Sequence, residues 1–298
     1  TGVFNNPGTF LRTTSALAGT INSTFNNTGI VDVQGGKLSL NGNGTHTGDF
    51  DSTGAILDIG GGTQTFSATS DITGTEVDFT GATATLSGTY SVTGDTNISG
   101  TIVNFTGATL NLINIGAALT VSGGTATFSS GELLAPTTLT LSGGTISGSD
   151  NITVSGLLTW SSGTMAGTGI TTANGGMALG GTYLTLQRRL DNANNGTATY
   201  SGPAYGFTIT SPGVFNNTLG STFDFQTDAA ISGTGSFNNA GTFLRTTSAL
   251  TGVISTVFNN TGFVDVQSGK LSLNGNGTHT GDFDATGTAL ILGAGTQT

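Results

Sequence analysis

A long internal repeat is the feature that most limits what this chain can fold into. Residues 1–65 and 234–298 align without a gap at an offset of 233, and about 50 of the 65 aligned positions carry the same residue. Self-similarity at a fixed distance is typical of chains built from stacked structural units. We therefore expect one long repeat unit over residues 1–233 and the start of the next over residues 234–298.

A shorter and less regular repeat lies inside this unit. The tripeptide Phe-Asn-Asn recurs at nearly equal steps, from Phe4 to Phe25 in the first copy and from Phe215 to Phe237 and Phe258 later in the chain. A period of about 20–26 residues that tolerates insertions is typical of a solenoid with one coil per repeat. We expect each Phe to point inward and stack, and each Asn pair to lie at a corner and form a hydrogen-bonded ladder. The predicted ladder residues are Phe4, Asn5, Asn6, Phe25, Asn26, Asn27, Phe215, Asn216, Asn217, Phe237, Asn238, Asn239, Phe258, Asn259 and Asn260.

The local pattern within a coil is that of a β-strand. The segment VDVQGGKLSL (31–40) alternates apolar and polar residues on both sides of a Gly pair, so that one face is buried and the other meets water. Helical periodicity is absent, and so is the strict six-residue rhythm of left-handed solenoids. The sequence therefore predicts an all-β, right-handed parallel β-helix, continuous over residues 1–298, with coils of about 20–26 residues.

The composition limits which fold classes and which partners are open to such a chain. Only 7% of the residues are charged, the net charge is -10, and there are 51 Gly, 4 Pro and no Cys. The Gly content without Pro or a G-X-Y period excludes collagen, and no basic patch is present for nucleic acid. No run of 18 apolar residues occurs, so this segment is not expected to insert into a membrane. The pattern is interrupted at both ends, and we expect the sequence to be an excerpt of a longer protein.

Several motifs carry a family resemblance. The runs FNNTG, VDVQ and GKLSLNGNGTHTG in both copies, VSGGTATFSSGE (121–132) and FNNAGTF (237–243) resemble the Gly/Thr/Asn-rich repeats of long bacterial exoproteins. These β-solenoids form the filamentous haemagglutinin and autotransporter-passenger class. The resemblance implies secretion, a place at the cell surface or in the extracellular matrix, and adhesion or fibre formation. It carries over no functional residues, because no secretion-domain or receptor-binding motif matches.

We expect a structural extracellular filament or adhesin stalk rather than an enzyme. Its expected partners are further copies of itself, end to end or side by side, and surface glycans or other cells. A carbohydrate-active enzyme or carbohydrate-binding module is the first alternative, but the acids are scattered and Glu occurs only at Glu76 and Glu132. Asp71, Glu76 and Asp78 lie close in sequence and are expected to face solvent.

Ice or crystal-surface binding by threonine arrays is the second alternative. Thr-x-Thr occurs at residues 45–47, 63–65, 125–127 and 197–199. Because these pairs do not recur at one fixed step, we expect no flat, regular array. Outward Thr is also favoured simply by its β propensity.

A turn sequence that occurs in both copies holds the two histidines. His46 with Asp49 and Asp51, and likewise His279 with Asp282 and Asp284, are the candidates for a metal site. Zinc usually takes three or four protein ligands, and the Asp-rich turns lack the repeat of known calcium-binding solenoids. We therefore assign no metal and no cofactor, with calcium as the alternative, and read these residues as an exposed turn.

The least repetitive segment runs from Tyr183 to Phe207. It gathers basic and aromatic residues that are scarce elsewhere, and it is either a loop that contacts a ligand or an ordinary coil with a longer turn. The candidate contact residues are Arg188, Arg189, Tyr200 and Tyr205.

Overall fold

The structure, a computed structural model, describes residues 2–13, 16–107, 109–202 and 206–298. These residues form strands and turns, and none of them is helical, so that no helix long and apolar enough to cross a bilayer occurs among them. The chain divides into two compact units, residues 1–151 and 152–298. The predicted continuity of a single solenoid over residues 1–298 stays a prediction, and each unit is described by itself.

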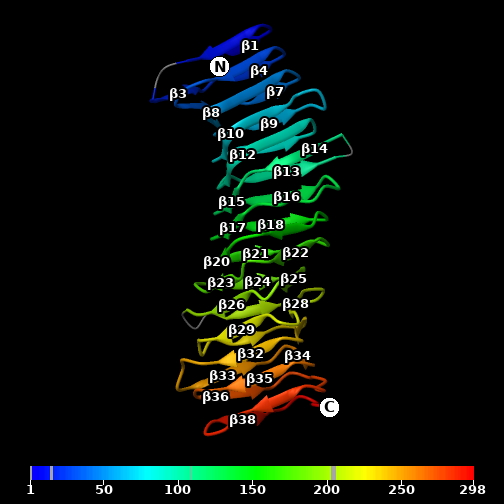
Figure 1. Cartoon of the computed structure of the whole chain (residues 1–298). Coiled ribbons are helices and arrows are strands. Elements are labelled where there is room, and N and C mark those ends of the chain that lie inside the picture. Colours follow the sequence, from blue (N-terminus) through cyan, green and yellow to red (C-terminus); the bar gives the residue numbers. More distant parts are fainter. Residues whose placement is uncertain (1, 14–15, 108, 203–205) are drawn as a thin grey trace. The chain divides into compact units, whose positions relative to one another are not determined.

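The first unit is a stack of three-sided coils (Figure 1). Its first face consists of β1 (Val3–Asn6), β4 (Thr24–Asn27), β7 (Gly44–His46), β9 (Thr63–Phe66), β11 (Thr83–Leu86), β13 (Ile102–Thr106), β16 (Thr125–Ser129) and β18 (Thr145–Gly148). Its second face consists of β2 (Thr9–Arg12), β5 (Ile30–Val33), the first parts of β8 (Asp49–Ile59), β10 (Ile72–Phe79) and β12 (Thr89–Ile98), and β14 (Asn111–Ile115). Its third face consists of β3 (Ala18–Ile21), β6 (Lys37–Leu40), the second parts of β8, β10 and β12, β15 (Ala118–Val121) and β17 (Thr138–Leu141).

The second unit repeats this plan with shorter strands. Its first face consists of β19 (Ile152–Val154), β22 (Ile170–Ala173), β25 (Arg189–Asn192), β28 (Val214–Asn217), β31 (Ser236–Asn239) and β34 (Val257–Asn260). Its second face consists of β20 (Leu158–Trp160), β23 (Met177–Leu179), β26 (Thr197–Tyr200), β29 (Thr222–Phe225), β32 (Thr242–Arg245), β35 (Phe263–Val266) and β37 (Asp282–Asp284). Its third face consists of β21 (Gly163–Met165), β24 (Leu184–Leu186), β27 (Phe207–Ile209), β30 (Ile231–Ser232), β33 (Thr251–Ile254), β36 (Lys270–Leu273) and β38 (Ala289–Leu292).

All the strand pairs within each unit are parallel and join one coil to the next. This confirms the predicted fold class, a parallel β-solenoid, which has about 14 turns. The coil length varies, since the step from Thr251 to its partner Lys270 is shorter than the step from Phe207 to its partner Ile231. Most of the differences lie in the turns, and the rest lie in irregularities within the long strands, such as the register shift between Gly74 and Glu76 of β10.

Alternation along each strand builds the core. In β4, β28, β31 and β34 the Phe and the second Asn point inward, and the residues between them point outward. Phe215 and Phe237 stack with ring centroids 4.7 Å apart, as expected for an inward Phe column. The Asn pairs do not lie at corners, as the sequence suggested, but within strands, where alternation sends one side chain inside and one outside.

The corner after each Phe-Asn-Asn strand belongs to glycine instead. A Cβ on Gly29 would lie 2.0 Å from the carbonyl oxygen of Gly8, and one on Gly262 would lie 2.1 Å from that of Gly241. Neighbouring coils therefore approach so closely at this corner that a side chain does not fit.

Candidate functional site: asparagine ladders and two ionic clusters

The inward asparagines of the second unit form one continuous ladder. It consists of Asn192, Asn217, Asn239 and Asn260, all of them buried. The Nδ2 groups of the first three donate to the Oδ1 of the Asn in the following coil over 2.8–2.9 Å, and that of Asn260 donates to the carbonyl of Asp282. The same Nδ2 groups also donate to backbone carbonyls of the second face, such as Asn217 to Thr242 O at 2.9 Å. Both N–H groups of these amides are thus used, and the ladder ties two faces of adjacent coils together.

The outward asparagines form a second ladder with the opposite polarity. Asn216 Nδ2 donates to Asp191 Oδ1 at 2.7 Å, Asn238 to Asn216 at 2.9 Å, and Asn259 to Asn238 at 2.9 Å. The donors of this ladder point to the preceding coil and end on a carboxylate, which can only accept. Two antiparallel rows of amide dipoles therefore run along the same face.

The first unit begins in the same way and then changes. Asn6 Nδ2 donates to Asn27 Oδ1 at 2.8 Å, and Asn26 Nδ2 donates to Asn5 Oδ1 at 2.9 Å. In the next coil His46 takes the inward position beside Asn27. A histidine thus continues the inward row of polar side chains.

The His-Asp turn does not assemble a metal site. His46 is fully buried, and its Nε2 lies 2.8 Å from Gln64 Oε1, whereas Asp49 and Asp51 point outward. His279 repeats the contact with Gln297 Oε1 at 2.6 Å, and Asp282 and Asp284 are exposed. Among the described residues no group of three or more His, Cys, Asp or Glu side chains is placed to hold a metal ion. The histidines are therefore part of the core rather than of an exposed turn.

An ionic cluster that the sequence did not predict lies on the third face of the first unit. Lys37 Nζ is 3.3 Å from Asp58 Oδ2 and 3.0 Å from Asp78 Oδ2. The other contacts to these carboxylates come from the hydroxyls of Ser39 and Thr80 and from the amide of Asn97. Every oxygen of the two carboxylates accepts a hydrogen bond, so that the pair is occupied in cross-linking coils.

The charges of this cluster perturb one another. Burial alone would lower the pKa of Lys37, but the hydrogen bond to Asp78 and the charges of Asp58 and Asp78 raise it overall. The pKa of Glu76 is raised by burial and by the charges of Asp78 and Asp95. Asp71 and Glu76 are only half-buried, whereas Asp78 is mostly buried, so that the expectation of a solvent-facing Asp78 is wrong.

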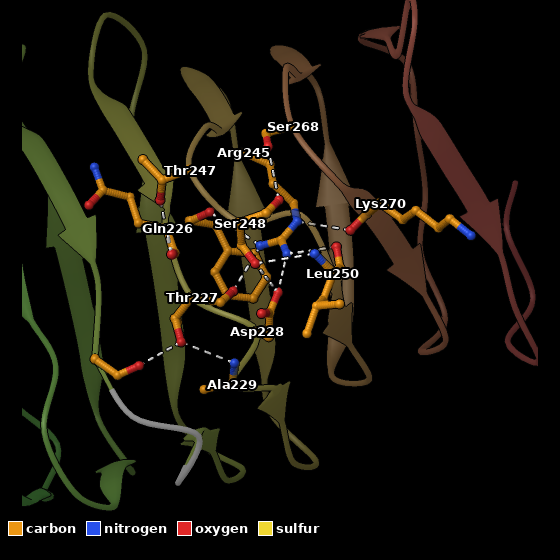
Figure 2. A network of polar contacts seen from close by, with 12 residues as sticks. Gln226, Thr227, Asp228, Ala229, Arg245, Thr247, Ser248, Leu250, Ser268 and Lys270 are labelled. Carbon is orange, nitrogen blue, oxygen red and sulfur yellow. Dashed lines mark hydrogen bonds and ion pairs between the residues drawn. The ribbon is translucent and has the colours of Figure 1, made fainter.

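A second ionic cluster surrounds Arg245 in the second unit (Figure 2). The guanidinium is fully buried, and its Nη2 lies 2.6 Å from Asp228 Oδ1. Further bonds reach the carbonyls of Phe225, Thr227, Leu250 and Lys270, the last at 2.8 Å. The ring of Phe225 lies below the guanidinium, with its centroid 4.9 Å from Cζ.

The candidate contact segment is mostly ordinary solenoid. Arg188 is buried and donates to Gly169 O at 2.9 Å, and Tyr200 is buried in the core, where it stacks on Phe225 at 5.6 Å. Arg189 is half-exposed and pairs with Asp191 at 2.8 Å. Tyr205 lies outside the described residues. Arg188 and Tyr200 therefore do not form an exposed contact surface.

Outward threonines on the first face of the first unit do form rows. One row consists of Thr63, Thr83, Ile102, Thr125 and Thr145. The next consists of Thr45, Thr65, Thr85, Asn104, Thr127 and Ser147. Unequal steps along the sequence therefore do not prevent rows, but Ile102, Asn104 and Ser147 interrupt the threonines, so that a regular threonine array stays a hypothesis.

No protein-family model, no curated protein and no solved structure matches the chain. The candidate site is therefore defined by this structure alone, through the two asparagine ladders and the two ionic clusters. The ionic clusters join residues that lie one or two coils apart. A search of the sequence for opposite charges separated by one or two coil lengths could therefore have found them.

Proposed function

We propose that this chain is a structural part of an extracellular filament or adhesin stalk. The observation that carries the proposal is how its polar groups are used. The buried asparagines, both carboxylates of the Lys37 cluster and the Arg245 guanidinium all bond from one coil to the next. A chain whose buried charged side chains join neighbouring coils is suited to a mechanical role, because parallel ladders share a load over many hydrogen bonds.

The proposed place is the cell surface or the extracellular matrix, and the proposed partners are copies of itself and surface glycans or other cells. The resemblance to filamentous haemagglutinin and autotransporter-passenger repeats supports this part. The absence of cysteine is compatible with it, since the ladders and the core hold the coils without disulfides.

The test is to label intact cells with antibodies raised against residues 1–298 and to image material shed into the medium. We expect surface labelling and long fibres with a layer line near roughly 4.8 Å and an axial repeat of roughly 50 Å for each long repeat unit. Signal confined to permeabilised cells would refute the location. Short isolated particles would refute the fibre.

The threonine rows favour a second candidate, binding to the surface of ice. In-register outward hydroxyls recur about every 4.8 Å along the stack and about every 6.7 Å along each strand, a spacing that can order water. Thr85→Tyr should then abolish inhibition of ice recrystallisation, whereas Thr199→Tyr, on an outward position of β26 in the second unit, should not. No inhibition by the unaltered protein would reject this candidate.

A further inference from the structure

The same arginine has two different environments in the two copies of the repeat. Arg12 corresponds to Arg245, since both end the matching sequence TFLR at the offset of the long repeat. Arg245 takes three contacts from the preceding coil, namely the carboxylate of Asp228 and the carbonyls of Phe225 and Thr227. In the described chain Arg12 has no such coil beside it. Its Nη2 donates to Leu17 O, as Arg245 donates to Leu250 O, and its buried Nε has no partner.

The surface around Arg12 is hollow where the second copy is filled. A cavity of about 410 Å³ is lined by Phe10, Leu11, Arg12 and Gly19, among others. At the matching place in the second unit, a Cβ added to Gly252 would lie 2.7 Å from the ring of Phe225. Gly252 corresponds to Gly19, so that the cavity has the position of the Phe225 ring.

The neighbouring strand β1 on the first face is likewise less covered than its counterpart β31. Phe4 is 41% exposed, whereas its counterpart Phe237 is fully buried and stacks on Phe215 at 4.7 Å. Asn238 donates to Asn216 of the preceding coil at 2.9 Å, whereas its counterpart Asn5 accepts from Asn26 of the following coil and makes no side-chain bond to any other described residue. An occupant of this surface therefore needs a Phe, an Asn pair, a second aromatic ring and a carboxylate, in that order.

We infer that the coil seated on residues 2–13 and 16–21 has a sequence like that of residues 214–228, VFNNTLGSTFDFQTD. The geometry points to this occupant because each required group lies in that segment at the required place. Its Phe215 would stack on Phe4, its Asn216 and Asn217 would continue both ladders, its Phe225 would fill the cavity, and its Asp228 would pair with Arg12. The junction between successive long repeat units is thus specified by complementary charge and ladder polarity rather than by β-pairing alone.

Two coils of this chain can be compared as occupants of the surface around Arg12. The coil of residues 276–298 corresponds to residues 43–65 and carries Gly277, Thr278 and His279 where residues 214–217 carry Phe215, Asn216 and Asn217, because His279 is the parallel partner of Asn260. Stacking that coil on residues 2–13 and 16–21 leaves Arg12 without a carboxylate in the matching position. A coil in the register of the internal repeat therefore brings an Asn pair and a carboxylate to this surface, whereas the coil of residues 276–298 does not.

The experiment adds a coil to the full chain. One protein carries a copy of residues 213–233 before Thr1, which reproduces the natural Gly233–Thr234 junction, and a control carries residues 276–298 there. We expect only the first to raise the unfolding midpoint, by roughly 2–4 °C or more, and to slow amide exchange of residues 3–6 at least tenfold. Arg12→Gln, or Asp228→Asn in the added copy of residues 213–233, should remove most of that gain in the unfolding midpoint.

Three outcomes decide the matter. Equal stabilisation by the two added coils would overturn the inference, because β-pairing alone would then explain the junction. So would a matched coil whose gain is unaffected by Arg12→Gln. A matched coil that gives no gain at all would overturn it as well. None of these readouts depends on where the protein resides, so that the extracellular role can fail while the junction holds.

Discussion

The two copies of the repeat, residues 1–65 and 234–298, show what a neighbouring coil contributes. The copies share about 50 of 65 residues and the same order of strands. Yet Phe237 is fully buried and Phe4 is 41% exposed, and Arg245 makes an ion pair that Arg12 does not make with any described residue. The sequence of a coil sets its own shape, whereas much of its stabilisation comes from the coil before it.

The reverse difference occurs at Lys37. It pairs with Asp58 and Asp78, but the position that matches Asp58 in the second copy is Ile291, so that Lys270 cannot form the same pair. Repeat sequences can thus exchange a charged cross-link for an apolar residue without changing the coil, since Leu271 still pairs with Leu290. Interactions between neighbours are the variable part of a solenoid, as expected from its one-dimensional construction.

The largest effect is expected when a stacked ring is removed. Phe237→Ala should cost about 3–5 kcal/mol, because the cavity lies between the rings of Phe215, Phe223 and Phe258. Phe4→Ala should cost about 1 kcal/mol or less, since that ring is already partly in water. Urea unfolding followed by circular dichroism would measure both. Equal losses would contradict the view that the preceding coil makes the difference.

The arginine pair gives the next largest contrast. Arg245→Gln should cost about 2–3 kcal/mol, somewhat less than a fully buried ion pair, because the side chain of Asp228 is 32% exposed. Arg12→Gln should cost less than about 1 kcal/mol in the chain 1–298. Hydrogen exchange of residues 240–256 and 7–23 would report the two sites separately. A loss at Arg12 as large as that at Arg245 would break the comparison.

The buried His46 makes the stability of the first copy depend on pH. Burial lowers the pKa of His46 to about 4, and the hydrogen bond to Gln64 only partly offsets this. Because the unfolded imidazole has a pKa near 6.5, the unfolded state binds the proton first as the pH falls. Stability should therefore drop by about 2 kcal/mol between pH 7 and pH 5 and continue to drop towards pH 4.

Two variants isolate that contribution. His46→Gln should flatten the stability profile between pH 7 and pH 5. His279→Gln tests the second imidazole, which is only half-buried. A profile that keeps its slope in His46→Gln would show that another group causes it.

The sequence was sufficient for the fold but not for the chemistry between coils. The Phe-Asn-Asn period and the alternation in VDVQGGKLSL predict stacked parallel strands, because inward side chains must recur at coil length. Which outward charges meet depends on register, and register depends on how much of the chain each turn absorbs. That is why the pairing of Lys37 with Asp58 and Asp78, and the threonine rows, were missed. The inward place of His46 was missed because a polar residue was read as exposed.

The corner glycines give a smaller effect with a matched control. A Cβ on Gly241 would lie 2.1 Å from the carbonyl oxygen of Ser221, whereas one on Gly8, its counterpart, meets nothing within 4 Å. Gly241→Ala should therefore cost about 1–3 kcal/mol through displacement of the backbone. Gly8→Ala should be neutral or stabilise by up to about 1 kcal/mol, because alanine restricts the unfolded chain. Thermal unfolding would rank the two, and a destabilising Gly8→Ala would contradict the open corner.

The smallest effect on stability is expected from replacing Asp58 on the third face of the first unit with the residue found at the matching position, Ile291, of the second copy. Asp58→Ile installs the residue of the second copy and leaves Lys37 with Asp78, so that stability should change by about 1 kcal/mol or less. The pKa of Lys37 should fall, because the charge and hydrogen bond of Asp58 help to raise it. Carbon NMR at Lys37 Cε would follow that titration, with Ile291→Asp as the reciprocal variant beside Lys270. An unchanged Lys37 pKa would show that Asp78 alone stabilises the ammonium. A loss of several kcal/mol in stability would mean that the hydrogen bonds of Asp58 to Ser39 and Thr80 join the three coils more strongly than a partly exposed ion pair can.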